Sequence, residues 1–285
     1  MAAVAGFIEA MRATLTELSG DQRRTPPALP STLPPSVLPV VSAGVHQLIS
    51  YQGPDYAQLY LDRLRRFAGR KTVSEPLFAE IARLLAQRMS YLDPIALSQA
   101  ALAAHGDGAR ADERHCLDLD ELLAACPAMI SEQVLEALHW VGWQHRPVTL
   151  RFRATNRLGR QRLRAQAALR RWRLLSPRYA RERALTERWL HMIDRCLSKQ
   201  PQAAGAVVAS AQLLQGCGAA YRARLAAWHL IIDGLAKPVF DGALMLPDLA
   251  GAIETARGTV SDDPQQPALR RLIAQIREQA APAAG

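Results

Sequence analysis

Arginines crowd one segment of this chain. Fifteen arginines and three acidic residues lie between Arg146 and Arg195, a net charge of +12 in a chain whose total is +9. A guanidinium group is a strong hydrogen-bond donor to carboxylates and phosphates, and burying one without a partner costs a large free energy. Most of these arginines must therefore face water or an anionic partner.

Three interpretations fit this arginine segment. The long stems can cover apolar neighbours on a solvated helix face. An acidic protein surface would be attracted by the positive charge. Nucleic acid is the third, weakened because Trp172 and Tyr179 are too few for a stacking platform and no recognition motif is present. The residues that we assign to binding an anion or an acidic partner are Arg151, Arg153, Arg157, Arg160 and Arg164.

Motifs for metals, phosphates and nucleophiles are weak. The cysteines have no CxxC pair, which favours buried free thiols; they are Cys116, Cys126, Cys196 and Cys217. One loop is crowded with possible ligands, and solvation is favoured there over a metal: His105, Asp107, Asp112, Glu113, His115 and Cys116. Gly216 and Gly218 indicate a tight turn between helices more than a phosphate site. We therefore assign no catalytic residue and no metal ligand.

The composition favours helices. The chain is 49% hydrophobic, only 6% aromatic and rich in alanine. We expect a mainly α, bundle-like domain with at most one or two short strands near residues 147–154, where Val148, Leu150 and Phe152 alternate with polar residues. Tyrosines 51, 56, 60 and 91 and the tryptophans at 140, 143, 172, 189 and 228 are expected in the core. The lack of a long apolar run and of a signal peptide predicts a cytoplasmic protein.

Breaks in helical periodicity divide the chain. We predict an N-terminal helix over residues 1–18, a proline-rich linker over 19–39, a helical domain over 40–238, and C-terminal helices and a tail over 239–285. Gly53-Pro54 should separate two helices, and Ser74, Asp118 and Ser131 should begin others, with a polar loop before Asp118. Further helices are predicted at 156–174, 177–198, 202–215, 219–235, 247–257 and 265–280.

Three segments carry a family resemblance. YQGPDYAQLYLDRL at residues 51–64 is similar to a YQD-x-x-YA-x-x-Y stretch, and LFAEIARLLAQRMSYLD at 77–93 is similar to ARxLAxxMAYED. Residues 150–235 resemble arginine-rich helices followed by a KGYG-x-T turn. In this order and spacing, over residues 43–236, these motifs resemble the C-terminal region of the long form of indolepyruvate ferredoxin oxidoreductase subunit beta. AAVAGFIEAMRATL at residues 2–15 resembles the final helix of that subunit's preceding domain.

The resemblance implies a non-catalytic helical component or accessory domain of an indolepyruvate-type 2-oxoacid ferredoxin oxidoreductase. That complex converts aryl pyruvates to acyl-CoA by oxidative decarboxylation. The family places thiamine diphosphate and iron–sulfur clusters on the alpha subunit, so no cofactor is expected on this chain. The implied partners are the alpha subunit and ferredoxin. The alternative is a free-standing anion- or nucleic-acid-binding helical module.

The chain departs from the family pattern at the KGYG-x-T turn. Gln215 and Cys217 stand where the family has Lys and Tyr, and Ala219 and Ala220 replace an acid and a Thr. If the family's polar residues form a site, much of it is lost here. This departure favours a structural role over a catalytic one.

Overall fold

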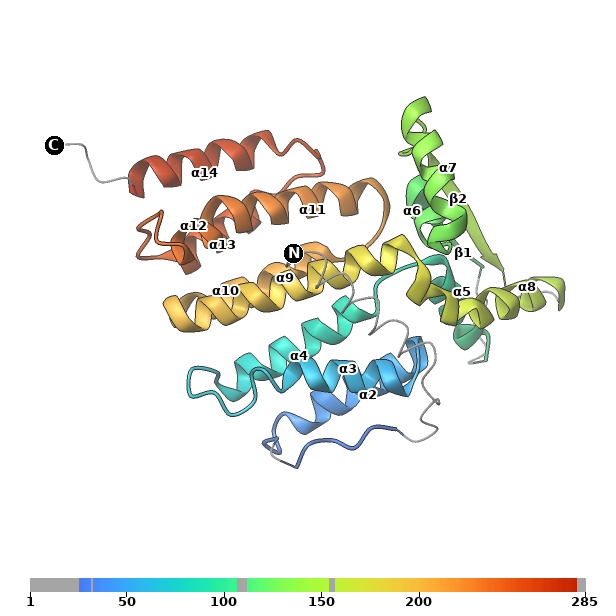
Figure 1. The fold of residues 1–285 in the computed structure, drawn as a ribbon, viewed down its shortest axis with the longest axis horizontal. Helices are drawn as coiled ribbons and strands as arrows, with labels where there is room; N and C mark the ends of the chain where they lie inside the picture. Colours follow the sequence, from blue (N-terminus) through green and yellow to red (C-terminus); the bar gives the residue numbers. More distant parts are fainter. Residues whose placement is uncertain (1–25, 32, 107–111, 154–156, 281–285) are drawn as a thin grey trace.

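Helices make up most of the structure (Figure 1). The computed structural model describes residues 26–31, 33–106, 112–153 and 157–280. The predicted mainly α class is confirmed over these residues, while the helix predicted near the N-terminus lies outside them. No helix in the described ranges is both long and apolar enough to cross a membrane.

The first layer contains α2 (Leu38–Tyr51), α3 (Pro54–Leu64) and α4 (Glu75–Met89). Gly53 separates α2 from α3 with a φ of 137°, a backbone conformation that favours glycine, so the predicted break is confirmed. The Ser74 hydroxyl accepts a hydrogen bond from the Leu77 N–H and caps α4 as predicted. Ahead of α2, the proline-rich segment buries Leu33 and Val37 in the core.

The middle layer is built on α9 (Pro177–Lys199), the longest described helix. The Ser176 hydroxyl caps its N-terminus by accepting from the Tyr179 N–H at 3.1 Å. The chain returns through η2 (Pro201–Ala203), α10 (Ala204–Ala209) and η3 (Ser210–Leu214). Both α9 and α10 pack on α4, which joins this layer to the first.

The last layer follows the Gly216–Gly218 turn. It contains α11 (Gly218–Ile231), the π-helical turn η4 (Ile232–Ala236), α12 (Lys237–Phe240), α13 (Leu249–Gly258) and α14 (Pro267–Ala280). In this layer α13 packs on α10, and α14 packs on α11 and α13 (Figure 1). All helices predicted after residue 156 are present, although several end in a 3₁₀ or π turn.

A smaller unit lies beside the layers (Figure 1). It contains α5 (Pro94–Gly106), β1 (Asp112–Asp118), α6 (Leu119–Ala124), α7 (Ala128–Val141), β2 (Pro147–Arg153), α8 (Arg157–Ala168) and the 3₁₀ helix η1 (Leu169–Leu175). The strand predicted near 147–154 is confirmed as β2, and it pairs antiparallel with β1. We expected a polar loop before Asp118, and this was wrong, because backbone pairing with β2 makes a strand of a segment with little apolar alternation.

Two further expectations about this unit were wrong or partly so. Helix α7 begins three residues before Ser131, directly after Pro127, so Ser131 is not its N-cap. The predicted helix start at Asp118 is confirmed, and a capping box with Glu121 forms there. The small core of this unit is a cluster of Leu97, Ala101, Leu117, Phe152 and Leu163.

The main core fills the space between the helical layers. Trp189 and Trp228 lie in it fully buried, as predicted. Three other tryptophans were expected there and are exposed instead: Trp140, Trp143 and Trp172. They lie on the smaller unit, where short elements cannot surround a large ring on all sides. The hydroxyls of Tyr51, Tyr56 and Tyr60 donate to backbone carbonyls, as expected for buried tyrosines.

Candidate functional site

The arginine segment divides into an exposed part and a buried part. Exposed arginines concentrate on α8, whereas Arg173 and Arg178, further along the segment, are almost fully buried. Sequence periodicity separates apolar from polar helix faces, but it does not identify the arginines that have acidic partners elsewhere in the fold. Both parts are therefore candidate sites.

Three arginines of the segment form a stripe along α8, where Arg157 and Arg164 are exposed and Arg160 is half-buried. Arg157, Arg160, Gln161 and Arg164 line a surface hollow of about 420 Å³. Their spacing of three and four residues places them on one helix face, while Leu163 points into the small core. We call these four residues the α8 stripe. It holds three of the five arginines that the sequence assigned to anion or acidic-partner binding.

The other two predicted site residues lie on β2. Arg151 is exposed. The next residue, Phe152, is buried in the small core together with Leu163 of α8. Because side chains alternate along a strand, Arg151 lies on the opposite face of the sheet from Phe152. Arg153 ends the strand, in register with Asp112 of β1. The fold therefore groups the three α8 arginines on one helix face. It places Arg151 on the face of the two-stranded sheet that points away from the small core.

Large apolar side chains are exposed on the same unit. Trp140 on α7 is 89% exposed, and Leu158, next to Arg157 on α8, is 78% exposed. Trp143 lies under the Arg146 guanidinium, which is 5.0 Å from the ring centre. Exposed tryptophan beside arginine is typical of protein interfaces. The sequence did not identify Trp140 and Trp143 as surface residues, because their helical spacing predicted a place in the core.

The buried part of the segment belongs to a network of ion pairs. The Arg173 guanidinium donates to both carboxylate oxygens of Asp93, at 2.6 and 3.0 Å, and to the Tyr51 carbonyl at 2.8 Å. It also lies 3.8 Å from the centre of the Tyr51 ring. Tyr51 and Asp93 come from the two N-terminal segments that carry the family resemblance. Arg173 thus ties the smaller unit to the first layer.

A second buried group joins three layers. Arg88 of α4 donates to Glu182 of α9 at 2.6 Å, and the Tyr221 hydroxyl of α11 donates to the other Glu182 oxygen at 2.9 Å. Arg178 lies between Glu182, at 4.0 Å, and Glu121 of α6, at 3.6 Å. Arginines and glutamates alternate through this group, so each buried guanidinium lies beside a carboxyl group.

The N-terminus of α11 is part of the same network. The Gly218 N–H donates to Glu121 at 2.8 Å, and Gly216 and Gly218 have φ values of 103° and 68°. The predicted tight turn is therefore confirmed, and a carboxylate of the chain itself occupies the place where a phosphate would bind. Burial raises the pKa of Glu121, against the opposing effects of Arg178 and this hydrogen bond.

A hollow of about 300 Å³ opens beside the network. Arg88, Glu182 and Tyr221 form its deeper wall, and the Gln87 and Gln215 side chains, hydrogen-bonded to each other at 2.8 Å, lie at its rim. The sequence missed these residues. One signal was available, since Arg88 lies between Leu85 and Met89 on the apolar face of its helix, where a charged residue requires a buried partner.

Possible metal ligands are spread out. Of the crowded loop, Asp107 lies outside the described residues, and Glu113, His115 and Cys116 are on β1. Within the described ranges, Asp118, Asp120 and His145 bring ligand atoms within 4.8 Å of one another, but Arg222 already pairs with Asp118. Of the four cysteines, Cys196 is buried as expected and Cys217 is half-buried, while the expectation was wrong for the exposed Cys116 and Cys126.

Comparison with known families gives one match. A family model described as a family of unknown function (DUF6537) matches residues 37–234, well over half of the chain. No curated protein and no solved structure matches. The matched range runs from the helices of the first layer through the smaller unit to α11, and it includes both the α8 stripe and the buried network. The chain belongs to DUF6537, a family of unknown function.

Proposed function

We propose that this chain is a non-catalytic helical component of an indolepyruvate-type 2-oxoacid ferredoxin oxidoreductase. Its task in the complex is to dock an acidic protein surface, on the alpha subunit or on ferredoxin, in the cytoplasm. The sequence resemblance over residues 43–236 supports the assignment to this complex. Aryl pyruvate oxidation, thiamine diphosphate and iron–sulfur clusters then belong to the partner subunit.

The α8 stripe is the observation that carries this proposal. Three guanidinium groups stand on one face of a single helix, around a hollow of about 420 Å³. The exposed Leu158 adds apolar area next to them. A row of arginines with an adjacent apolar residue suits a carboxylate-rich protein surface, because charge speeds the encounter and apolar contact slows dissociation.

The buried network supports a structural role for Tyr51 and Asp93, two polar residues of the segments that resemble the oxidoreductase family. Arg173 donates hydrogen bonds to Asp93 and to the Tyr51 carbonyl, and Glu182 accepts hydrogen bonds from Arg88 and Tyr221. The charged groups of these residues form ion pairs and hydrogen bonds between elements of different layers. A docking role therefore fits this chain better than bond-making chemistry.

Copurification tests the proposal. The chain is expressed with the alpha subunit of an indolepyruvate ferredoxin oxidoreductase from the same source, and the complex is captured at low salt. We expect the alpha subunit to be retained, and we expect Arg157→Glu/Arg160→Glu/Arg164→Glu to lose it. The matched control reverses three charges at exposed arginines elsewhere, Arg65→Glu/Arg181→Glu/Arg271→Glu, and should retain it.

Two results would overturn this proposal. One is the absence of the alpha subunit and of ferredoxin from the captured complex at low salt. The other is binding of random duplex DNA that the α8 triple variant abolishes while the alpha subunit is not retained. The second result would favour the alternative, a nucleic-acid-binding module, whose affinity should fall steeply with salt.

A further inference from the structure

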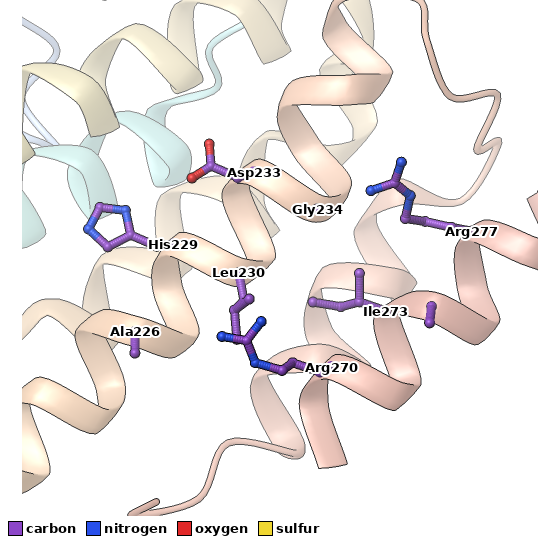
Figure 2. Close-up of a pocket in the computed structure, with 9 residues that line it drawn as sticks. Ala226, His229, Leu230, Asp233, Gly234, Arg270, Ile273 and Arg277 are labelled. Carbon is purple, nitrogen blue, oxygen red and sulfur yellow. The ribbon is translucent and has the colours of Figure 1, made fainter. Parts of the chain in front are cut away.

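A second positively charged groove lies between helices of the last layer. It has a volume of about 810 Å³ and runs between α11 with its π-helical continuation η4 on one side and α14 on the other. Figure 2 shows Arg270, Ile273 and Arg277 on one wall and Ala226, His229, Leu230 and Asp233 on the other. We call this the α11–α14 groove. None of its lining residues belongs to the α8 stripe or to the buried network.

The floor of the α11–α14 groove is apolar and closely packed. Ile273 is buried and Leu230 is half-buried. A Cβ on Gly234 would lie 2.9 Å from the Ile273 side chain, so the glycine allows α14 to approach η4 at this point. A π-helical turn is rare and often marks a functional position, since it costs hydrogen-bond geometry. The floor therefore offers a fixed apolar surface.

The charge of the groove is positive. Asp233 forms an ion pair with Arg188, whose guanidinium also lies 3.0 Å from the His229 ring nitrogen Nδ1. Burial, helped by Arg188, lowers the pKa of His229 below its ordinary value of 6.5. The acid on this wall is thus neutralised within the chain. Among the described residues, no acid forms an ion pair with Arg270 or Arg277 on the opposite wall.

The spacing of these two arginines fits a helical ligand. Arg270 and Arg277 are seven residues apart, which is two helical turns, or about 10.5 Å along the axis of α14. Ile273 and Ala274 lie between them, on the same face. A second helix lying along the groove would present acidic side chains at the same seven-residue spacing and apolar side chains between them.

We propose that the α11–α14 groove binds an acidic amphipathic helix of a partner protein. A second copy of this chain is a poor occupant, because each copy carries +9 and the helix at its groove contributes Arg270, Arg271 and Arg277. Arg270 donates to the Gln265 carbonyl at 2.8 Å, but neither it nor Arg277 has an acidic partner among the described residues. An apolar floor between two such guanidinium groups is the complement of an acidic helix. This inference does not depend on the assignment to an oxidoreductase.

A peptide titration tests the inference. The probe is a synthetic helix with leucines along one face and glutamates seven residues apart beside them, and its twin has lysine at every glutamate. Binding to the full chain is measured by fluorescence anisotropy. We expect the glutamate peptide to bind, the lysine twin to bind much less, and Arg277→Glu to weaken the glutamate peptide about tenfold, the loss expected for reversing one charge-assisted contact.

The control is Arg271→Glu, which makes the same charge reversal at an exposed position of the same helix that does not line the groove. It should keep most of the affinity. The α8 triple variant should also bind the glutamate peptide normally, which separates this test from that of the proposed function. Equal binding of both peptides, no binding of the glutamate peptide, or equal losses in Arg277→Glu and Arg271→Glu would overturn the inference.

Discussion

The Arg88 guanidinium and the Glu182 carboxylate meet at 2.6 Å in the core, although 94 residues separate them in the chain. Both side chains are nearly inaccessible to water. Arg88 also donates to the Leu214 carbonyl, and Tyr221 donates to Glu182. The ion pair therefore joins α4 to α9, and the Tyr221 hydrogen bond adds α11, so Glu182 connects the three layers of the fold.

Glu182→Gln should destabilise the protein strongly. The substitution keeps the shape of the side chain but leaves the buried charge of Arg88 without its partner, which costs about 3–5 kcal/mol in comparable pairs. The free energy of unfolding, measured with urea, should fall by about that amount. Glu80→Gln is the control, because Glu80 pairs with Arg83 on the surface, where such pairs contribute less than about 1 kcal/mol. Similar losses in both variants would contradict this account.

The ionisation of Glu121 should make the free energy of unfolding depend on pH. Burial raises its pKa above the ordinary value of 4.5, so the folded protein holds this proton more tightly than the unfolded chain. The protonated Glu121 therefore contributes to the free energy of unfolding. This contribution is fully present below pH 4.5 and is lost as the pH rises through the raised pKa. Glu121→Gln cannot ionise and should not show this loss. The free energy of unfolding is measured for both proteins from acidic to neutral pH.

Relative to Glu121→Gln, the wild-type protein should become less stable as the pH rises through this window. Glutamine keeps an oxygen that can accept the Gly218 N–H, so the cap of α11 is preserved in the comparison. Parallel stability curves for the two proteins would show that Glu121 ionises equally easily in the folded and unfolded states.

Two glycine substitutions should have opposite effects. In Gly44→Ala the new methyl would lie 2.6 Å from the buried Tyr60 hydroxyl and 2.9 Å from its ring, so the core must shift, at about 1–3 kcal/mol. Gly205 lies in α10 with nothing within 4 Å of a Cβ, so Gly205→Ala should stabilise the helix by about 0.5–1 kcal/mol. Thermal unfolding of the two variants checks both signs, and a stabilised Gly44→Ala would disprove the close packing of α2 on α3.

Most of the residues that cap and break helices, Ser131 excepted, were readable from the sequence because their effects are local. Ser74, Gly53-Pro54 and the Gly216–Gly218 turn act on backbone groups a few residues away, and each was found where predicted. The strand β1 was missed for the opposite reason. Its partner strand β2 lies 29 to 41 residues later in the chain, and its own residues alternate poorly.

The sequence by itself determined that a mainly helical chain carries an excess of arginine between Arg146 and Arg195, since composition and period depend on the residues alone. Only the tertiary structure decided which arginines are used internally. Arg173 and Arg178 are buried because Asp93 and Glu121 reach them from distant elements, and Glu182 lies one turn along α9 from Arg178. Arg157 and Arg164 stay exposed on α8. A charge is buried only where the fold brings a partner, and that depends on contacts between segments far apart in the chain.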